Sequence, residues 1–323
     1  MADIYDGVFR TILNDCRQLI LPLINEIFEE NYAGDETIEF YPNEHFIDQL
    51  DEPDKKRITD TNFTVIKDLV SKKYHLECES SLPDGRMTIR LFEYDAQIAL
   101  DEGTVVEETL TVTFPHTAVL YLRNYSKTPD QMWYVIITPG GTVRYRIPIM
   151  KVQTYSIDEI FEKRLLLLIP FYMFIHEKDF EVYNSNDEKL AQLKREWRGI
   201  IDRLNQLEQQ GIIGAYDKRT ILDLSKDVIK ELTKKYGRIN QEVGDLMRGA
   251  MIETEARRLR NEGIREGFGE GFGEGLQQGE SLLAKLFATL FSLGRDSDAK
   301  RAATDEKARQ ELYREFGMID DEK

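Results

Sequence analysis

Apolar residues recur along the chain with two different periods, and the change of period predicts where helices give way to strands. Between residues 4 and 30 the apolar positions follow helical spacing, so we expect a first helix there in spite of Pro22. These positions are Ile4, Val8, Ile12, Leu19, Leu23 and Ile27. The short stretch IEFYP at 38–42 is then a candidate strand.

Two longer stretches alternate between polar and apolar positions, as strands with one buried face do. The first, RITDTNFTVI at 57–66, sets Asp60, Asn62 and Thr64 against Thr61, Phe63 and Val65. The second, KKYHLECES at 72–80, follows after a short turn and places Leu76 and Cys78 on one side. Its other side carries His75, Glu77 and Glu79.

A turn, a helix and further strands follow. LPDGR at 82–86 predicts a turn, and MTIRLFEYDAQIAL at 87–100 predicts a helix. Strands are expected at 110–114, 117–123, 132–138 and 143–155, with a PGG turn at 139–141 between the last two. This order of elements predicts an α/β fold, a mixed sheet flanked by helices.

Strand patterns stop at about residue 184. Helices are expected at 187–211, 218–236 and 239–262, which together form an all-helical C-terminal module. A glycine then occupies every fourth position from Gly263 to Gly279, and a charged, solvated helix follows. We therefore divide the chain into a sheet domain at 1–184, a helical module at 185–262 and a repeat and charged tail at 263–323.

The glycine repeat has two interpretations. Glycines four residues apart mark one side of a helix and permit close approach of a second helix, which favours a self-association strip. The alternative is a flexible linker produced by repeat expansion. We expect a homo-oligomer formed through the helical C-terminal region.

Charge is unevenly distributed along the chain. The formal net charge of −16 argues against a general nucleic-acid coat protein. Residues 1–185 hold 32 acidic and 18 basic residues, whereas residues 186–323 hold 27 and 25. The basic residues of the helical module either contact a DNA backbone or form ordinary solvated helix faces. They are Lys230, Lys234, Lys235, Arg238, Arg248, Arg257, Arg258 and Arg260.

The cysteines and the apolar segments bear on location. Cys16 and Cys78 are too few for a disulfide framework and indicate buried free thiols of a reducing compartment. The start, MADIYDGVFR, lacks the pattern of a secretory signal. The apolar run at 165–175 is too short to span a bilayer and contains Pro170. We expect a soluble, cytoplasmic protein without a membrane partner.

Glu77 and Glu79 are the first candidates for chemistry. Residues two apart on a strand point the same way, with Cα atoms about 6.5–7 Å apart. Asp60 is expected on the polar side of the adjacent strand. Three converging carboxylates suit a hard divalent cation such as Mg²⁺, which can activate a bound water and stabilise a phosphate under attack. The alternative is a solvated sheet face that carries acids.

The helix predicted at 87–100 carries a polar stripe on a largely apolar surface. The stripe consists of Arg90, Glu93, Tyr94 and Gln97, and Asp95 is the exception among the remaining apolar positions. Such a helix is expected to be buried, and a buried Arg90 needs carboxylates or phosphate as partners. An Arg–Glu pair within the core is the alternative.

The order of these residues resembles a known family. The resemblance is to the PD-(D/E)XK nuclease superfamily, and more specifically to the bacterial recombination-promoting nuclease (Rpn) and transposase family. It is carried by Asp60, Glu77-x-Glu79-Ser80, the Pro83-Asp84 turn, Met87, Arg90 and Tyr94. YDGVFRTILNDC, RITDTNF, TAVLYLRN, IFEKRLLLLIPFYMF and the glycine-rich tail are also similar to that family, so the resemblance covers nearly the whole chain.

The resemblance implies a restriction-endonuclease-like core that cleaves DNA with Mg²⁺ or Mn²⁺. It makes Asp60 and Glu77 metal ligands and Arg90 the source of positive charge beside the phosphate. Glu79 stands where the superfamily usually has Lys and this family commonly has Gln. As a third carboxylate, Glu79 either completes the metal shell or acts as a general base. Tyr94 and Gln97, which share the stripe of Arg90, are candidate substrate-binding residues.

Other residues carry weaker signals. Asp6 and Arg10 match the family's opening motif, and Arg10 is a candidate phosphate contact, with a helix-surface ion pair as the alternative. Glu44 and His45 either border the site or anchor a loop. His116 and His176 lack the spacing of a ligand set, and two scattered cysteines argue against zinc.

The sequence thus predicts a hydrolase, a cytoplasmic DNA endonuclease of low sequence specificity that acts in recombination, mobile-element transfer or defence. One alternative is a catalytically lapsed Rpn-like DNA-binding or scaffold protein that self-associates through its helical tail. Another is a nuclease that acts on RNA.

Overall fold

The computed structural model of the chain contains two compact units, Met1–Thr254 and Glu255–Lys323. It describes residues 4–41, 44–46, 56–58, 61–68, 70–81, 83, 85–251, 283, 285–287, 289–290 and 293–318. Residues 185–251 belong to the same compact unit as the sheet, and the divisions expected at residues 184 and 262 stay predictions. The glycine repeat at 263–279 lies outside the described residues.

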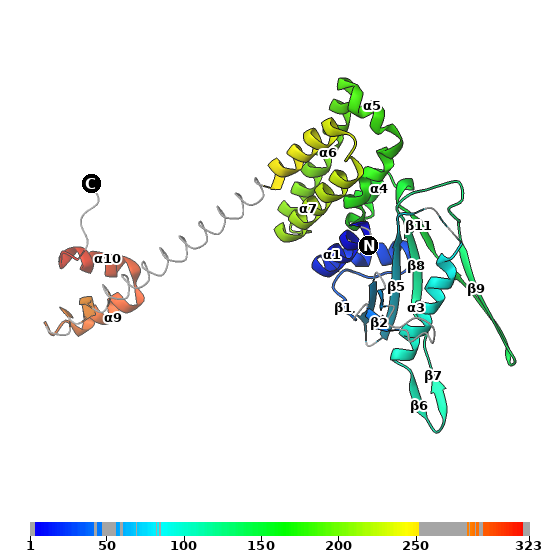
Figure 1. The fold of residues 1–323 in the computed structure, drawn as a ribbon. Coiled ribbons are helices and arrows are strands. Elements are labelled where there is room, and N and C mark those ends of the chain that lie inside the picture. Colours follow the sequence, from blue (N-terminus) through cyan, green and yellow to red (C-terminus); the bar gives the residue numbers. More distant parts are fainter. Residues whose placement is uncertain are drawn as a thin grey trace. The chain divides into compact units, whose positions relative to one another are not determined.

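A five-stranded mixed sheet forms the centre of the first unit (Figure 1). Its order is β1-β4-β5-β8-β11, with antiparallel pairing from β1 to β5 and parallel pairing from β5 to β11. The strands are β1 (Thr37–Phe40), β4 (Thr61–Lys67), β5 (Val70–Glu79), β8 (His116–Tyr121) and β11 (Ile149–Lys151). The prediction of a mixed α/β sheet accompanied by helices is confirmed.

Helices precede, interrupt and follow the strands. In chain order they are α1 (Ile4–Asp15), η1 (Arg17–Leu19), α2 (Ile20–Phe28), α3 (Met87–Asp101), η2 (Val152–Thr154), α4 (Ile157–Glu162), η3 (Leu166–Asp179), α5 (Phe180–Ser185), α6 (Asp187–Gln209) and α7 (Ala215–Leu232). Residues 237–251 are also helical. Helices therefore occupy the first two stretches predicted after residue 184 and the described part of the third, up to residue 251.

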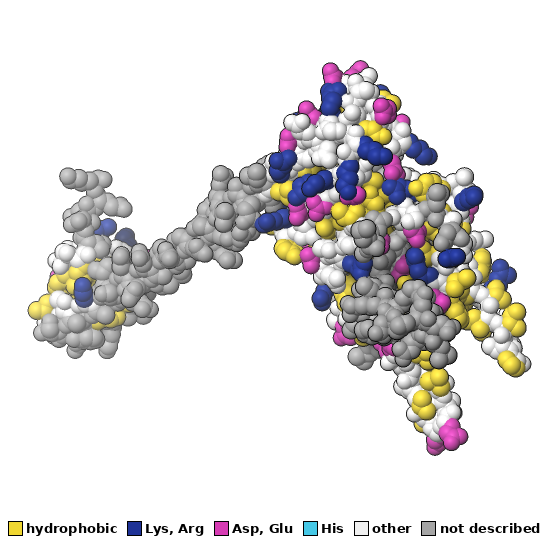
Figure 2. All heavy atoms as spheres, viewed as in Figure 1, with side chains coloured by type: hydrophobic (Ala, Val, Ile, Leu, Met, Phe, Trp, Pro, Cys, Tyr) yellow, Lys and Arg dark blue, Asp and Glu magenta, His cyan; other side chains and the backbone are white. Residues whose placement is uncertain are grey.

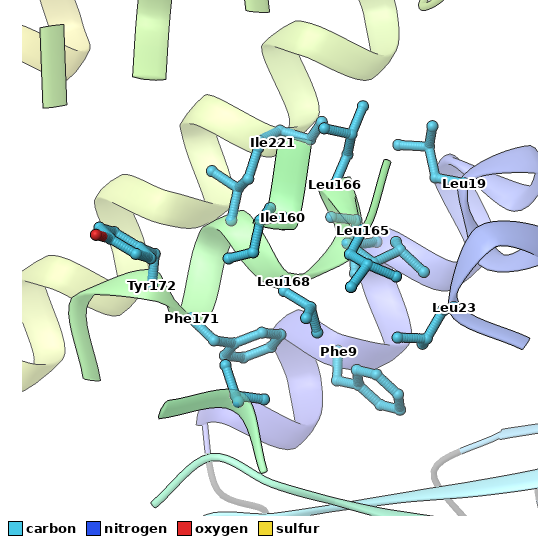
Figure 3. Close-up of a cluster of buried hydrophobic side chains, with 14 of the residues drawn as sticks. Phe9, Leu19, Leu23, Ile160, Leu165, Leu166, Leu168, Phe171, Tyr172 and Ile221 are labelled. Carbon is cyan, nitrogen blue, oxygen red and sulfur yellow. The ribbon is translucent and has the colours of Figure 1, made fainter. Parts of the chain in front are cut away.

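The two faces of the sheet are covered by different elements. On one face, Tyr74, Leu76 and Cys78 of β5 join a large apolar cluster that includes side chains from α1, α2, η3 and α7. Figure 3 shows the part of this cluster where Phe9 and Leu23 meet Leu168 and Phe171. On the other face, α3 contributes Met87 and Leu91 to a smaller apolar cluster with β8. Chain segments from both ends of the first unit thus bury one face, and α3 covers the other.

Two predicted elements are divided. The first predicted helix forms two helices, because η1 separates α1 from α2, and Pro22 lies in the first turn of α2, where no backbone N–H is required. The two strands expected at 110–114 and 117–123 correspond to β7 (Thr109–Thr111) and β8. The strand expected at 143–155 is interrupted at Pro148, and residues 152–154 form η2 instead.

The expectation that α3 is buried was wrong for part of its surface. Leu91, Ile98 and Ala99 are buried, but Phe92 and Leu100 are exposed. Phe92 lies at the margin of the helix, where its ring contacts those of Phe114 and Tyr134. The helix is therefore amphipathic, with solvent along one side.

The described part of the first unit also contains three two-stranded sheets. They pair β2 (Glu44–Phe46) with β3 (Lys56–Ile58), β6 (Thr104–Val106) with β7 (Thr109–Thr111), and β9 (Met132–Thr138) with β10 (Gly141–Ile147), and the last two pairs are hairpins. The β6–β7 hairpin begins directly after α3, and β9 contacts α3. Both extend away from the sheet in Figure 1.

The second unit has a small apolar cluster of its own. Two short helices, α9 (Asp296–Thr304) and α10 (Glu306–Glu315), pack around Leu286, Leu290 and Leu312. The Asp305 carboxylate accepts hydrogen bonds from the first backbone N–H groups of α10 and so fixes where that helix begins. The charged segment expected at the end of the chain is thus two helices with a buried side.

No helix within the described residues is long and apolar enough to cross a membrane. The apolar run at 165–175, which includes Pro170, lies almost entirely in η3 and is packed in the large cluster.

Candidate functional site

The polar side of β5 forms the floor of the candidate site. Strand alternation turns His75, Glu77 and Glu79 away from the large apolar cluster that holds Leu76 and Cys78. β5 lies in the middle of the sheet, between β4 and β8, so its backbone hydrogen bonds are satisfied on both sides. α3 lies over this face and supplies the side chains that meet the three polar residues.

A chain of hydrogen-bonded side chains joins α3 to Glu77. The Nδ1 atom of His75 lies 2.7 Å from Oδ1 of Asp95, and its Nε2 atom lies 3.1 Å from Oε1 of Glu77. His75 is fully buried, and Asp95 and Glu77 are 1% and 4% exposed. The imidazole therefore fixes the orientation of the Glu77 carboxylate relative to the helix.

Asp95 is the acceptor on which this chain of side chains converges. Its Oδ1 atom accepts a hydrogen bond from the Thr117 hydroxyl at 2.6 Å, and its Oδ2 atom accepts one from the Tyr134 hydroxyl at 2.9 Å. With His75, three donors from β5, β8 and β9 surround one buried carboxylate. Burying this polar side chain would be costly without these donors.

Arg90 covers both glutamates. Its Nη2 atom donates a hydrogen bond to Oε2 of Glu79 at 3.1 Å and lies 3.6 Å from Oε2 of Glu77. The other oxygen of Glu79 accepts the backbone N–H of Ser81 at 2.8 Å, which holds this carboxylate at the end of β5. The Nε atom of Arg90 is buried, and no described residue accepts its hydrogen bond. Arg90 thus retains one buried donor beyond its contact with the glutamates.

Charge and burial act in opposite directions on the two cations of the site. Burial by itself lowers the pKa of His75, but the hydrogen bonds and charges of Asp95 and Glu77 outweigh it and raise that pKa to about 9. Burial likewise lowers the pKa of Arg90, and the charges of Glu77 and Glu79 reverse the effect and raise it. At neutral pH both groups are therefore cationic, and they neutralise the carboxylates around them.

Solvent reaches this cluster from the side of Arg90 and Glu79. The Arg90 side chain is 40% exposed and that of Glu79 is 17% exposed, whereas Glu77 lies beneath them. A ligand that approaches from solvent meets the guanidinium and the Glu79 carboxylate first. The site is therefore an open polar surface with a buried support.

The structure brings together three of the residues that the sequence selected. Glu77, Glu79 and Arg90 meet as described above, and Tyr94 lies beside them, with its ring 5.9 Å from that of His75. Asp60 lies outside the described residues; the residue after it, Thr61, pairs with Leu76 in the sheet.

Two selected residues lie away from this cluster. Gln97 donates a hydrogen bond to Asp101, farther along α3. The Arg10 guanidinium donates a hydrogen bond to the Asp6 carbonyl oxygen of its own helix. That helix, α1, packs on the opposite face of the sheet with Leu76 and Cys78. Neither contact places these two residues beside Glu77 and Glu79.

Sequence reasoning missed the roles of His75 and Asp95. His75 was placed on the polar side of its strand without a function, and Asp95 was the exception on an apolar helix. The signal for Asp95 was its position four residues after Leu91 and three before Ile98, both of which are buried. An acidic residue on the same face of the helix as two buried residues must itself be buried and must have a hydrogen-bond donor or a cation as its partner. The partner itself comes from another element and cannot be found by helical spacing.

The oxygen-rich side chains on this face fit a hard divalent cation in type. Glu77 and Glu79 both approach one guanidinium nitrogen, which shows that the position between them favours positive charge. Asn62, whose register partner on β5 is His75, has a buried Oδ1 atom without a hydrogen-bond partner among the described residues. Carboxylate and amide oxygens are the ligands that Mg²⁺ prefers. Within the described ranges, no three His, Cys, Asp or Glu side chains are arranged to hold a metal ion.

No family model, curated protein or solved structure matches this chain. The residues and contacts of the site are therefore the basis for inferring a function.

Proposed function

We propose that this protein is a divalent-metal-dependent nuclease of the PD-(D/E)XK type, related to the Rpn family, that hydrolyses DNA phosphodiester bonds. One observation carries the proposal. Two neighbouring carboxylates of a central strand converge on Arg90, which is partly exposed and has a buried donor without a described acceptor. The mixed sheet with helices on both faces is consistent with the restriction-endonuclease-like core that the sequence resemblance implies.

In this proposal the residues of the site have separate roles. Glu77, Glu79 and Asp60 would hold the cation, with Asp60 assigned from the resemblance alone. Bound there, Mg²⁺ would lower the pKa of a coordinated water and offset charge on the phosphate. Arg90 would donate hydrogen bonds from its exposed side to a phosphate oxygen, where negative charge grows as the nucleophile attacks.

His75 and Asp95 are positioning residues in this proposal. His75 holds one oxygen of Glu77 and leaves the other directed toward Arg90. Asp95 in turn fixes the ring of His75 and keeps it protonated at neutral pH. Such support keeps a carboxylate in one orientation, so less reorganisation is needed when a ligand binds.

Nicking of supercoiled plasmid tests the proposal. The wild-type chain is expected to nick with Mg²⁺ or Mn²⁺ and to lose the activity when the metal is chelated. Asp60→Ala and Glu77→Ala are expected to abolish nicking. Asp130→Asn removes an exposed carboxylate that pairs with Lys151 and not with the site residues, and it serves as the matched control, with activity unchanged. Nicking that survives in both alanine variants would contradict the assignment, and a parallel RNA substrate shows whether DNA is preferred.

A second candidate is a DNA-binding or scaffold protein that no longer cuts. The observation in its favour is that Arg90 and His75 already pair with Glu77 and Glu79 and supply positive charge there. Glu79 also replaces the Lys or Gln expected from the resemblance. Wild-type protein that binds plasmid but never nicks it, with any divalent metal, supports this candidate. Nicking that appears only in Glu79→Gln or Glu79→Lys would show that Glu79 disables the site.

A further inference from the structure

Exposed apolar side chains are concentrated on two hairpins of the first unit. Seventeen large hydrophobic side chains are exposed in the described part of the chain, and eight of them lie on or directly beside the β6–β7 and β9–β10 hairpins. They are Val105, Val106, Leu110, Val112, Trp133, Val135, Ile137 and Val143. In Figure 2, apolar side chains are visible along both projecting hairpins. Apolar surface gathered in this way marks an interaction site.

The β6–β7 hairpin has one apolar face and an acidic tip. Val105 and Leu110 are cross-strand partners and share a face, and Val112 follows two residues later on the same side. A Cβ atom at Gly103 would lie 3.2 Å from Leu110 and 3.4 Å from Val112, so these side chains lie directly against the glycine backbone. The turn residues Glu107 and Glu108 are both exposed.

The β9–β10 hairpin has an apolar row beside a basic row. Trp133, Val135 and Ile137 of β9 share one face, and Ile137 is 80% exposed. Opposite them on β10 are Arg146 and Arg144, and the Arg144 guanidinium lies 4.3 Å from the Trp133 ring centre. Tyr134 and Ile147 point the other way and anchor the hairpin to the sheet. The exposed face is therefore separate from the face that holds the hairpin in place.

The two hairpins carry opposite charges. No Lys or Arg occurs between residues 91 and 122, whereas Asp101, Glu102, Glu107 and Glu108 lie within or beside the β6–β7 hairpin. No Asp or Glu occurs between residues 131 and 157, which include Arg144, Arg146 and Lys151. In a chain with a net charge of −16, the second segment is a local exception. The hairpins are thus complementary to each other in charge and alike in apolar content.

We propose that the β6–β7 hairpin of one copy of this chain docks on the β9–β10 hairpin of a second copy. An isolated two-stranded hairpin is only marginally stable in water, so both gain from a partner. Protein interfaces are enriched in Trp and Arg and depleted of Lys, and the β9–β10 hairpin has this composition, with Trp and Arg beside aliphatic side chains. Two copies related by a two-fold axis would make this contact twice, because each carries both hairpins. This inference does not depend on nuclease activity.

Charge reversal with complementation tests this interface on the full chain. Arg144→Glu with Arg146→Glu makes both hairpins acidic, and Glu107→Lys with Glu108→Lys makes both basic. All four side chains are exposed, so both double variants are expected to fold like the wild type. Sedimentation velocity should show a wild-type dimer, and each variant alone should dissociate at least about tenfold more readily, because like charges then oppose each other. An equal mixture of the two variants should form dimers again.

Two further variants separate this interface from other causes. Val135→Ser with Ile137→Ser removes apolar surface without a change of charge and should also weaken the dimer. Arg195→Glu with Arg198→Glu reverses two exposed arginines of α6 and should leave the dimer unchanged.

Several outcomes would overturn the inference. A wild-type monomer at high concentration is one, and a dimer that persists in both charge-reversed variants is another. Variants that dissociate but do not recombine in the mixture would show that the two hairpins are not each other's partner. If the arginine variant loses plasmid binding while its mass is unchanged, the basic hairpin contacts DNA instead.

Discussion

The buried side chains on the two faces of β5 are stabilised by different forces. Leu76 and Cys78 lie in an apolar cluster, where burial itself is favourable and no particular partner is required. His75 and Glu77 lie on the opposite face at the same depth, where burial is costly unless every charge meets its counterpart. One strand thus shows both ways in which a protein interior can be filled.

The comparison shows why the polar face points to function. A sheet that needed only stability would bury apolar residues on both faces, because a buried charge cluster is seldom more stable than well-packed hydrocarbon. Asp95, His75 and Glu77 instead form an ordered series that ends beneath the partly exposed Arg90. A polar arrangement that adds little stability yet orients a carboxylate beneath a partly exposed cation is typical of a binding or catalytic site.

The largest expected effect comes from the centre of the polar face. Asp95→Ala removes the acceptor of His75, Thr117 and Tyr134 at once and leaves three buried donors unpaired. We expect unfolding in urea to require about 4 kcal/mol less free energy, as is usual when one member of a buried ionic cluster is removed. Asp101→Ala is the matched control on the same helix, because Asp101 is exposed, and it should cost less than about 0.5 kcal/mol. Equal effects of the two changes would show that Asp95 does not organise this face.

The apolar face should tolerate a comparable truncation somewhat better. Leu76 is fully buried, and Leu76→Ala removes hydrophobic contacts and leaves a cavity but no unpaired polar atom. We expect a loss of about 3 kcal/mol in the same urea experiment. Val70→Ala is the control, since Val70 belongs to the same strand and is exposed. A larger loss for Leu76→Ala than for Asp95→Ala would reverse the comparison between the faces.

Local patterns were sufficient to separate the two faces. Alternation in KKYHLECES assigned Leu76 to one side and Glu77 to the other, because strand periodicity is a property of the chain itself. For the same reason the helical period located α3 and the helices after residue 184. These predictions needed no knowledge of the partner elements.

The sequence did not show which side chains from other elements contact these residues. Asp95 belongs to the site because β8 and β9 bring Thr117 and Tyr134 to it, and these residues lie 22 and 39 positions away. Phe92 looked like a core residue by helical spacing, but its side chain is exposed. Burial depends on which elements cover a helix, and that information is spread over the whole fold.

The contact of Arg90 with the glutamates should contribute much less to stability than the buried cluster. Its side chain is 40% exposed, so solvent and salt screen the attraction to Glu77 and Glu79. We expect Arg90→Gln to cost about 1 kcal/mol in dilute buffer and less at high salt. Arg198→Gln, an exposed arginine of α6, should change stability by no more than about 0.5 kcal/mol. A loss that does not shrink with salt would mean that Arg90 is a structural part of the buried cluster.

The smallest effect concerns a thiol on the apolar side of the sheet. Burial, together with the charge of Asp217 and a hydrogen bond to it, raises the pKa of Cys16 to about 12. Below about pH 8.5, the unfolded pKa of a thiol, Cys16 is protonated in both states and the free energy of unfolding does not depend on its ionisation. Between about pH 8.5 and about pH 12 only the unfolded chain loses the proton, so the free energy of unfolding falls progressively as the pH rises. At moderate pH the folded chain should therefore hold Cys16 in its protonated form.

Thiolate absorbance in a Cys78→Ala variant measures the ionisation of Cys16 directly. The double variant Cys16→Ala/Cys78→Ala is the blank, whose subtraction removes the tyrosine contribution. Between about pH 7 and pH 9, folded protein should gain almost no thiolate signal, and urea-unfolded protein should titrate with a midpoint near about 8.5. A folded-state midpoint in that same range would mean that Cys16 is accessible to water. The apolar face would then be open beside α1, and the contrast between the two faces of β5 would be weaker than the burial of their side chains indicates.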